Sequence, residues 1–264
     1  MSEKGNVLWT LRQDSLTSQL KEGKRAGGRK LDETREIKIL KEGVSENAHG
    51  IARVKLGNTD VIAGVKLDVA TPYPDSPDEG AISVGVELLA LASPDFEAGP
   101  PREDAIELSR VVDRGIRESH AIDFKALSIV PGEKCWMVII DIYVLNQDGN
   151  LFDAASIAAA SALLDTKIPK INDEYKIIRG EFSGKLKLSK KPVMSTFAKI
   201  GSTVVLDPDM EEETAASARF SIGIADDDTI CAFQKGGSGS FTHEEISHCI
   251  ELAFKNAKHI RKLL

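Results

Sequence analysis

The stretch from Val138 to Ser156 contains the residues whose types and spacing could bind an anion. Its apolar residues 138–144 predict a buried strand, Asp148-Gly149 predicts a tight turn, and the small residues from Ala154 predict the opening of a helix. Unpaired N–H groups at the start of such a helix, together with the helix dipole, favour a bound phosphate.

The side chains in this turn do not suit phosphate. Leu151 and Phe152 occupy positions where a phosphate site needs a hydroxyl group and a cation. Asp153 adds a carboxylate in the opening of the predicted helix, where it would take the N–H groups and the field that phosphate needs. The backbone pattern therefore predicts an anion site, whereas the side chains predict that this site does not hold its anion.

Three other patterns suggest chemistry, and each has a simpler structural interpretation. The acids Asp226 to Asp228 fit a solvated hairpin turn, because adjacent carboxylates alone do not define a metal site. His243 and His248 are five residues apart, whereas paired zinc ligands on a helix lie at i and i+4. The stretch 236–240 lacks the Lys-Ser/Thr of a P-loop. We therefore expect neither a metal nor a cofactor.

Composition limits the class of protein. The chain has 264 residues, and 41 acidic against 34 basic residues give a formal net charge of −7. This charge argues against a protein that binds nucleic acid with its whole surface, but it is compatible with a local basic patch. No apolar run approaches the roughly 20 residues of a membrane span, and the first residues lack a signal-peptide pattern. Because the three cysteines are scattered, we expect reduced thiols and a cytoplasmic protein.

Periodicity predicts a mixed α/β (α+β) fold with largely antiparallel sheets. Strands are expected at 51–56, 61–69, 82–88, 137–146, 175–179, 193–200, 203–206, 215–225 and 229–235. Helices are expected at 7–22, about 101–118, 153–165 and 243–263. The order of these elements suggests a duplicated β/α unit. Residues 1–30 are expected to form a helical arm with a basic linker, and residues 31–264 a single domain.

Four separated motifs, which follow one another in the right order, resemble those of the ribonuclease PH superfamily. Residues 28–37 resemble the opening motif of that family, and residues 107–114 resemble its central helix. The motifs at 148–156 and 197–213 are similar, more specifically, to the non-catalytic ring subunit of the archaeal exosome. The resemblance covers about residues 25–264.

This resemblance implies the ribonuclease PH fold, with two βα halves of the ribosomal S5 domain 2-like type. It also implies an alternating hexameric ring, a trimer of heterodimers in which this chain alternates with a catalytic ribonuclease PH-like subunit below RNA-binding cap subunits. Such a ring degrades single-stranded RNA from its 3′ end, with inorganic phosphate as the nucleophile and nucleoside diphosphates as products.

The resemblance further implies that this chain has lost the catalytic site. Active relatives carry Gly-Ser/Thr-Arg where this chain has Asn150, Leu151 and Phe152. Loss of one well-placed donor commonly lowers a rate by about 10²- to 10³-fold. Asp207 and Glu213 fall where active relatives keep catalytic acids. Asp207 is therefore a relic, a structural hydrogen-bonding group, or an acid without a phosphate to serve.

A row of arginines on the predicted helix at 101–118 has two interpretations. Arg110, Arg114 and Arg117 are spaced i, i+4 and i+7, so they share one helix face. They form either a solvated face that pairs with Glu107 and Glu118, or an RNA-binding face at the ring interface near the partner's active site.

Arg102 is a further candidate for RNA contact. It opens the same helix, where active relatives often carry two adjacent arginines, and Glu103 replaces the second of them here. The expected function is a non-catalytic, RNA-contacting ring subunit. The alternatives are an autonomous phosphate-dependent 3′-to-5′ exoribonuclease and a general RNA-binding module.

Overall fold

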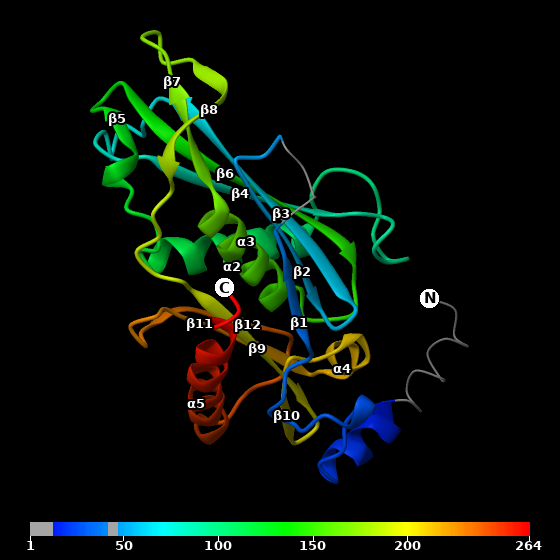
Figure 1. Ribbon diagram of the computed structural model, residues 1–264. Helices are drawn as coiled ribbons and strands as arrows, with labels where there is room; N and C mark the ends of the chain where they lie inside the picture. The colour runs from blue at the N-terminus through cyan, green and yellow to red at the C-terminus, as the bar shows by residue number, and fades with distance from the viewer. Residues whose placement is uncertain (1–12, 42–46) are drawn as a thin grey trace.

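The computed structural model describes residues 13–41 and 47–264, which form two sheets with helices packed between and beside them (Figure 1). The first sheet has the spatial order β1 (Ile37–Leu40), β2 (Gly50–Leu56), β3 (Thr59–Ala70), β6 (Lys134–Asn146) and β4 (Ala81–Leu88). The short β5 (Ser128–Val130) also pairs with β6. β4 runs parallel to β6, whereas the other pairs in this sheet are antiparallel.

The second sheet is antiparallel and has the order β10 (Thr203–Leu206), β9 (Val193–Ile200), β11 (Ala218–Ile224) and β12 (Ile230–Gly236). A separate hairpin joins β7 (Lys167–Ile171) to β8 (Ile177–Lys185). The helices are α2 (Glu103–Glu118), α3 (Leu151–Asp165), α4 (Met210–Ala215) and α5 (His243–Ile260), with short 3₁₀ turns at Ala26–Gly28 and Lys125–Leu127.

Helix α3 lies at the centre of the protein because its side chains are small. It packs against β2 and β3 of the first sheet and against β9 of the second (Figure 1). Every residue from Phe152 to Leu163 is buried. A Cβ atom at Gly50 would lie only 2.4 Å from the carbonyl oxygen of Ala162, so β2 begins with a glycine where the helix comes closest.

Strand β9 is buried almost throughout because helices cover both of its faces. α3 packs on one face and α5 on the other. This arrangement gives four layers, which are the first sheet, the pair α2 and α3, the second sheet, and α5. The start of α3, where the sequence predicts the anion site, therefore lies between the two sheets.

Most of the predicted elements are confirmed, with shifted ends. The hairpin of β2 and β3 turns at Gly57, whose φ of +59° favours glycine. Strands β1, β5 and β7 and helix α4 were missed. Because α4 occupies residues 210–215, the strand predicted at 215–225 begins only at Ala218. Residues 13–21 are helical, whereas the rest of the helix predicted at 7–22, with Leu8 and Leu11, lies outside the described residues.

The described part of the N-terminal arm is bound tightly to the second sheet. Leu16 and Leu20 of the 13–21 helix pack against Ala198, Ile200 and Val205. The arm was predicted as residues 1–30, and the boundary at residue 30 remains a prediction. None of the helices in the described ranges combines the length and the hydropathy that crossing a membrane would require.

Arg25 fixes the predicted basic linker to the domain. Its side chain is fully buried and forms two hydrogen bonds with Glu212, at 2.7 Å and 2.6 Å. It also donates to the carbonyl oxygens of Leu206 and Asp207, both at 2.9 Å. Arg25 is therefore part of the core. Its acceptors compensate for the cost of burying the charged guanidinium.

We predict that Arg25→Met destabilises the protein by about 3 to 5 kcal/mol, because the Glu212 carboxylate would stay buried without its partner. Urea unfolding measures this change. Lys24→Met is the matched control, since the Lys24–Glu22 pair is mostly exposed and should change the free energy of unfolding by less than about 0.5 kcal/mol. Equal effects of the two substitutions would contradict the role given to Arg25.

Candidate functional site

Asn150 organises the turn between β6 and α3. It has the left-handed conformation, with a φ of +53°, and caps the helix by accepting a hydrogen bond from the Asp153 backbone N–H. Its side-chain amide donates to Asp153 at 2.9 Å and to Asp207 at 2.7 Å. Its own backbone N–H donates to Glu213 Oε1 at 2.9 Å. One asparagine therefore joins three carboxylates at the start of α3.

Asp153 lies in the first turn of α3, as predicted, but the prediction that its carboxylate takes the N–H groups there is wrong. Its buried carboxylate points to β9, where it accepts hydrogen bonds from Thr196 Oγ1 at 2.7 Å and from the Thr196 backbone N–H at 3.1 Å. Asn150 and Glu213 instead occupy N–H groups in this turn. The N–H groups of Asn150 and Asp153 are thus engaged within the protein, and neither is engaged by the residue that the sequence indicated.

Asp207 is buried and fully engaged by donors. Arg35 binds it through Nη2 at 2.7 Å, through Nε at 2.9 Å and through its backbone N–H at 2.7 Å. Arg29 and Asn150 add further hydrogen bonds. Burial alone would raise the pKa of Asp207, but the hydrogen bonds and charge of Arg35 outweigh burial and hold the pKa below its usual range. This geometry favours the structural interpretation of Asp207.

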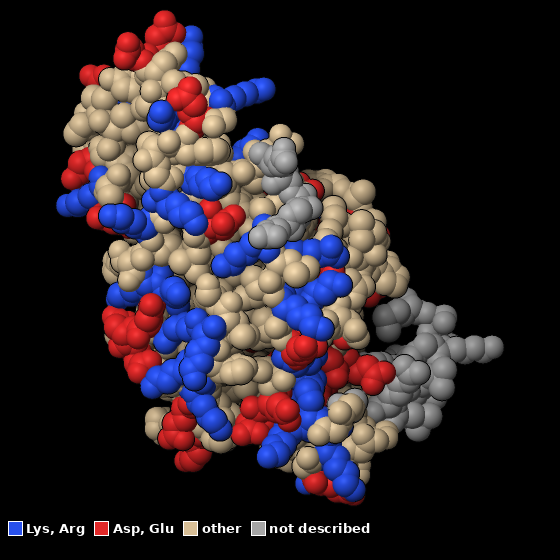
Figure 2. Space-filling view, in the orientation of Figure 1, with Lys and Arg blue, Asp and Glu red and all other residues tan. Residues whose placement is uncertain are grey.

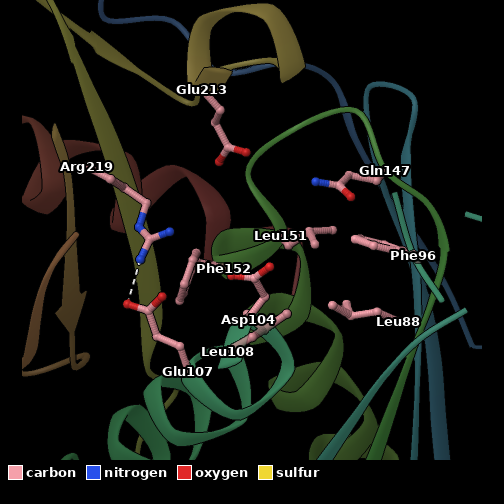
Figure 3. Close-up of a pocket in the computed structure, with 10 residues that line it drawn as sticks. All are labelled: Leu88, Phe96, Asp104, Glu107, Leu108, Gln147, Leu151, Phe152, Glu213 and Arg219. Atoms are coloured by element: carbon pink, nitrogen blue, oxygen red, sulfur yellow. Dashed lines mark hydrogen bonds and ion pairs between the residues drawn. The ribbon is translucent and has the colours of Figure 1, made fainter. Parts of the chain in front are cut away.

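A cavity of about 190 Å³ opens beside the first turn of α3 (Figure 3). Its apolar walls come from Leu88, Phe96, Leu108, Leu151 and Phe152. The polar groups that line it are Asp104, Glu107, Gln147, Glu213 and Arg219. Three carboxylates therefore face this space with a single guanidinium.

That guanidinium is already paired. Arg219 Nη2 donates to Glu107 at 2.7 Å, and its Cζ atom lies 4.0 Å from the centre of the Phe152 ring. Glu107 neutralises the charge that a phosphate would need, while Phe152 fills the space beside it (Figure 3). The cavity therefore disfavours an incoming phosphate both by charge and by shape.

Asp153, which is buried, and Glu213, which is half-buried, have strongly raised pKa values. Burial raises the pKa of Glu213 to about 7, against the opposing effects of the Asn150 N–H group and the Arg219 charge. Burial likewise raises the pKa of Asp153 to about 7, in spite of its hydrogen bonds with Asn150 and Thr196. Both acids therefore change charge near neutral pH.

The three arginines of α2 share an exposed face, as predicted. Arg114 donates to the carbonyl oxygen of Phe233 at 3.2 Å and to Gln234 Oε1 at 3.3 Å. Arg117 pairs with Asp113 at 3.0 Å, whereas Arg110 has no partner among the described residues.

The predicted pairing of this face with Glu107 and Glu118 is wrong. Glu107 instead binds Arg219 and Gln234, and the described chain shows no ion pair from Glu118. Arg102 is exposed and pairs with Glu97. No group of three or more potential metal ligands comes together within the described ranges.

The sequence analysis missed Arg35 and Arg219, which are the partners of Asp207 and Glu107. Arg35 and Asp207 are 172 positions apart, and Glu107 and Arg219 are 112 apart. No local periodicity connects such pairs. The pattern Asp209 to Glu212, which forms a capping box at the start of α4, was a readable signal for that helix.

Comparisons with known proteins agree over nearly the whole chain. Residues 33–169 match the model of domain 1 of the RNase PH 3′ exoribonuclease family, and residues 191–256 match that of domain 2. The chain is 48% identical to the exosome complex component Rrp42 of Thermococcus gammatolerans, over 98% of this chain and 95% of that protein. It is 44% identical to the protein of the same name from Methanothermobacter thermautotrophicus, over 100% and 98%.

Two solved structures are similar to the fold. A chain of the Archaeoglobus fulgidus exosome with RNA bound to the active site has a TM-score of 0.90 and 41% identity, over 97% of this chain and 98% of that one. A chain of an archaeal exosome core has a TM-score of 0.87 and 37% identity, over 98% of both chains. This agreement confirms the predicted fold class and the resemblance on which it depended.

We predict that Glu213 makes stability fall as the pH rises from about 5 to 7.5. Its pKa is higher in the folded state than in the unfolded state, so the folded protein keeps a proton in this range that the unfolded chain has released. This contribution is present at low pH and is lost as the pH passes about 7. Urea unfolding of Glu213→Gln should therefore show a pH dependence that is smaller by about 2 kcal/mol. An identical pH dependence in both proteins would contradict the assignment.

Proposed function

The chain belongs to the RNase PH family of 3′ exoribonucleases, and we propose that it is a non-catalytic ring subunit of an archaeal exosome-type RNA-degrading complex. The names of its relatives and its likeness to chains of two exosome structures support this assignment. In the complex, the chain alternates with a catalytic ribonuclease PH-like subunit in a hexameric ring, a trimer of heterodimers. RNA-binding cap subunits contact this ring.

The acidic cavity beside α3 is the observation that carries the non-catalytic assignment. Phosphorolysis requires a bound phosphate beside the scissile phosphodiester, positive charge to offset the developing negative charge, and an acid for the departing 3′ oxygen. Here the cavity presents Asp104, Glu107 and Glu213, and Glu107 already neutralises Arg219. The degenerate turn of Asn150, Leu151 and Phe152 supplies neither a hydroxyl group nor a cation.

The state of Asp207 argues against this residue as the general acid of an autonomous exoribonuclease. A general acid must hold a proton near the operating pH and must reach the leaving group. Asp207 has a lowered pKa and is enclosed by Arg29, Arg35 and Asn150. The alternative of a general RNA-binding module is disfavoured because the family match and the exosome relatives extend along the chain.

The proposed contribution of this chain to RNA binding is the exposed face of α2. Arg110, Arg114 and Arg117 offer three cations to the RNA backbone beside the partner's active site, and Arg102 lies near the start of the same helix. The net charge of −7 does not exclude a local basic patch of this kind. On the face shown in Figure 2, basic and acidic side chains are interspersed, so neither sign of charge covers the whole surface.

A cytoplasmic location is also part of the proposal. The described cysteines, Cys135, Cys231 and Cys249, are all free thiols. Reduced thiols are the usual state in compartments that keep glutathione and thioredoxin reduced.

We predict that the purified chain releases no nucleoside diphosphate from single-stranded RNA in the presence of phosphate. Activity should appear when the catalytic ribonuclease PH-like subunit is added and the two assemble. The assay follows phosphate-dependent shortening of a labelled RNA, and the mass of the complex measures the ring stoichiometry. Phosphorolysis by the purified chain alone would overturn the non-catalytic assignment.

We predict that Arg114→Glu weakens RNA binding by the assembled complex about 10-fold or more at low salt, because a phosphate contact becomes a repulsion. Assembly should be unchanged in size-exclusion chromatography. Arg179→Glu makes the same charge change on exposed β8 and serves as the control. If the two variants bind RNA equally well at low salt, the α2 face does not contact RNA.

A further inference from the structure

A continuous series of contacts connects the altered phosphate turn with Arg114. Phe152 lies under the guanidinium of Arg219, at 4.0 Å from the ring centre to Cζ. Arg219 Nη2 donates to Glu107 Oε1 at 2.7 Å. Gln234 Nε2 donates to the same carboxylate oxygen at 2.8 Å, and Gln234 Oε1 accepts from Arg114 at 3.3 Å. The side-chain amide of Gln234 therefore joins Glu107 to Arg114.

The residues of strand β12 leave room for this series of contacts and hold it in place. Arg219 on β11 is paired in register with Gly236 on β12. A Cβ atom at Gly236 would lie 2.8 Å from Arg219 Nη2, so the absence of a side chain leaves room for the guanidinium. Arg114 has a second acceptor on the same strand, the carbonyl oxygen of Phe233. The Phe233 ring stacks on Phe220 at 5.5 Å, which holds this part of β12 in place.

Such contacts matter because a free arginine loses conformational freedom when it binds a ligand. Fixing a long side chain before binding removes part of that entropic cost. Arg114 is exposed yet held by two acceptors, whereas Arg110, one turn earlier on the same face, has no partner among the described residues. Arg114 and Arg117 are thus the arginines of this face whose directions are set before RNA arrives, and Arg114 is the one held by the series of contacts from the altered turn.

We propose that Glu107, Arg219 and Gln234 are positioning residues for RNA binding. Side chains that fill the former phosphate site hold Arg114 in the direction from which it contacts the RNA backbone at the neighbouring catalytic subunit. This inference rests on the proposed RNA-contacting role of the α2 face. In this arrangement the altered site has a new use. The contact between Phe152 and Arg219 anchors the series of side chains that ends at Arg114, and neither residue binds phosphate.

The test is a double-mutant cycle in the complex reconstituted with the catalytic ribonuclease PH-like subunit. Gln234→Ala should raise the KM for single-stranded RNA by about 2- to 10-fold, because Arg114 must be ordered on binding. It should leave kcat unchanged, since the partner performs the chemistry. In an Arg114→Ala background, Gln234→Ala should have no further effect on KM or on RNA affinity measured by fluorescence anisotropy.

Glu107→Ala removes the next contact in the series and should show the same dependence on Arg114. Gln19→Ala makes the matched change on the exposed face of the 13–21 helix, so it should leave both constants unchanged. Thermal unfolding of each variant reports whether the fold is kept.

The outcomes separate this inference from the proposed function. If Arg114→Ala weakens RNA binding and Gln234→Ala does not, the positioning role is wrong and the RNA contact stands. An effect of Gln234→Ala that is equally large in the Arg114→Ala background would also overturn it, because the effect would not pass through Arg114. If Arg114→Ala leaves RNA affinity unchanged, the RNA-contacting face itself is wrong.

Discussion

The ion pair between Arg35 and Asp207 is the interaction on which the centre of this protein depends. Arg35 binds the Asp207 carboxylate with two side-chain nitrogens, and it also donates to the carbonyl oxygens of Asp148 and Gly149 in the turn after β6. One side chain therefore joins the segment before β1 to a turn from each sheet. Because a buried carboxylate without its partner is strongly destabilising, the folded state is stable only when these three segments are together. The negative charge of Asp207 then contributes to the raised pKa values of Asp153 and Glu213 nearby.

The same constraint explains why the turn keeps the backbone pattern of an anion site. A Cβ atom at Gly149 would lie 2.4 Å from the backbone carbon of Asp209, so the glycine allows the turn after β6 to pack against the start of α4. Asn150 adopts a positive φ and caps α3 while binding Asp207. Packing between the two turns is thus sufficient to preserve an Asp-Gly-Asn turn before a helix. The backbone pattern therefore reflects this packing, and by itself it is not evidence for a bound ligand.

The sequence predicted the layered α/β fold because its signals are local. Alternation in β2 and β3 and the alanines of α3 follow from burial within each element. The short β1, β5, β7 and α4 were missed because three to six residues give little periodicity, and β7 also contains Pro169. The site was only partly predictable. Leu151 and Phe152 led to the prediction that phosphate contacts are lost. The direction of Asp153, by contrast, depends on Thr196 across the core, and the partner of Glu107 depends on β11.

The proposed loss of phosphate chemistry and the proposed RNA-contacting face are electrostatically consistent on one helix. Asp104 and Glu107 of α2 line the cavity, whereas Arg110, Arg114 and Arg117 lie on its exposed face. A polyanion that approaches α2 is repelled from the cavity and attracted to the arginines, because the two sets of charges have opposite signs. Glu107 contributes to both effects, because it neutralises Arg219 inside the cavity and binds the glutamine that holds Arg114. A carboxylate at this position therefore disfavours phosphate in this chain's own site while it supports the arginine that the proposed function directs to the neighbouring one.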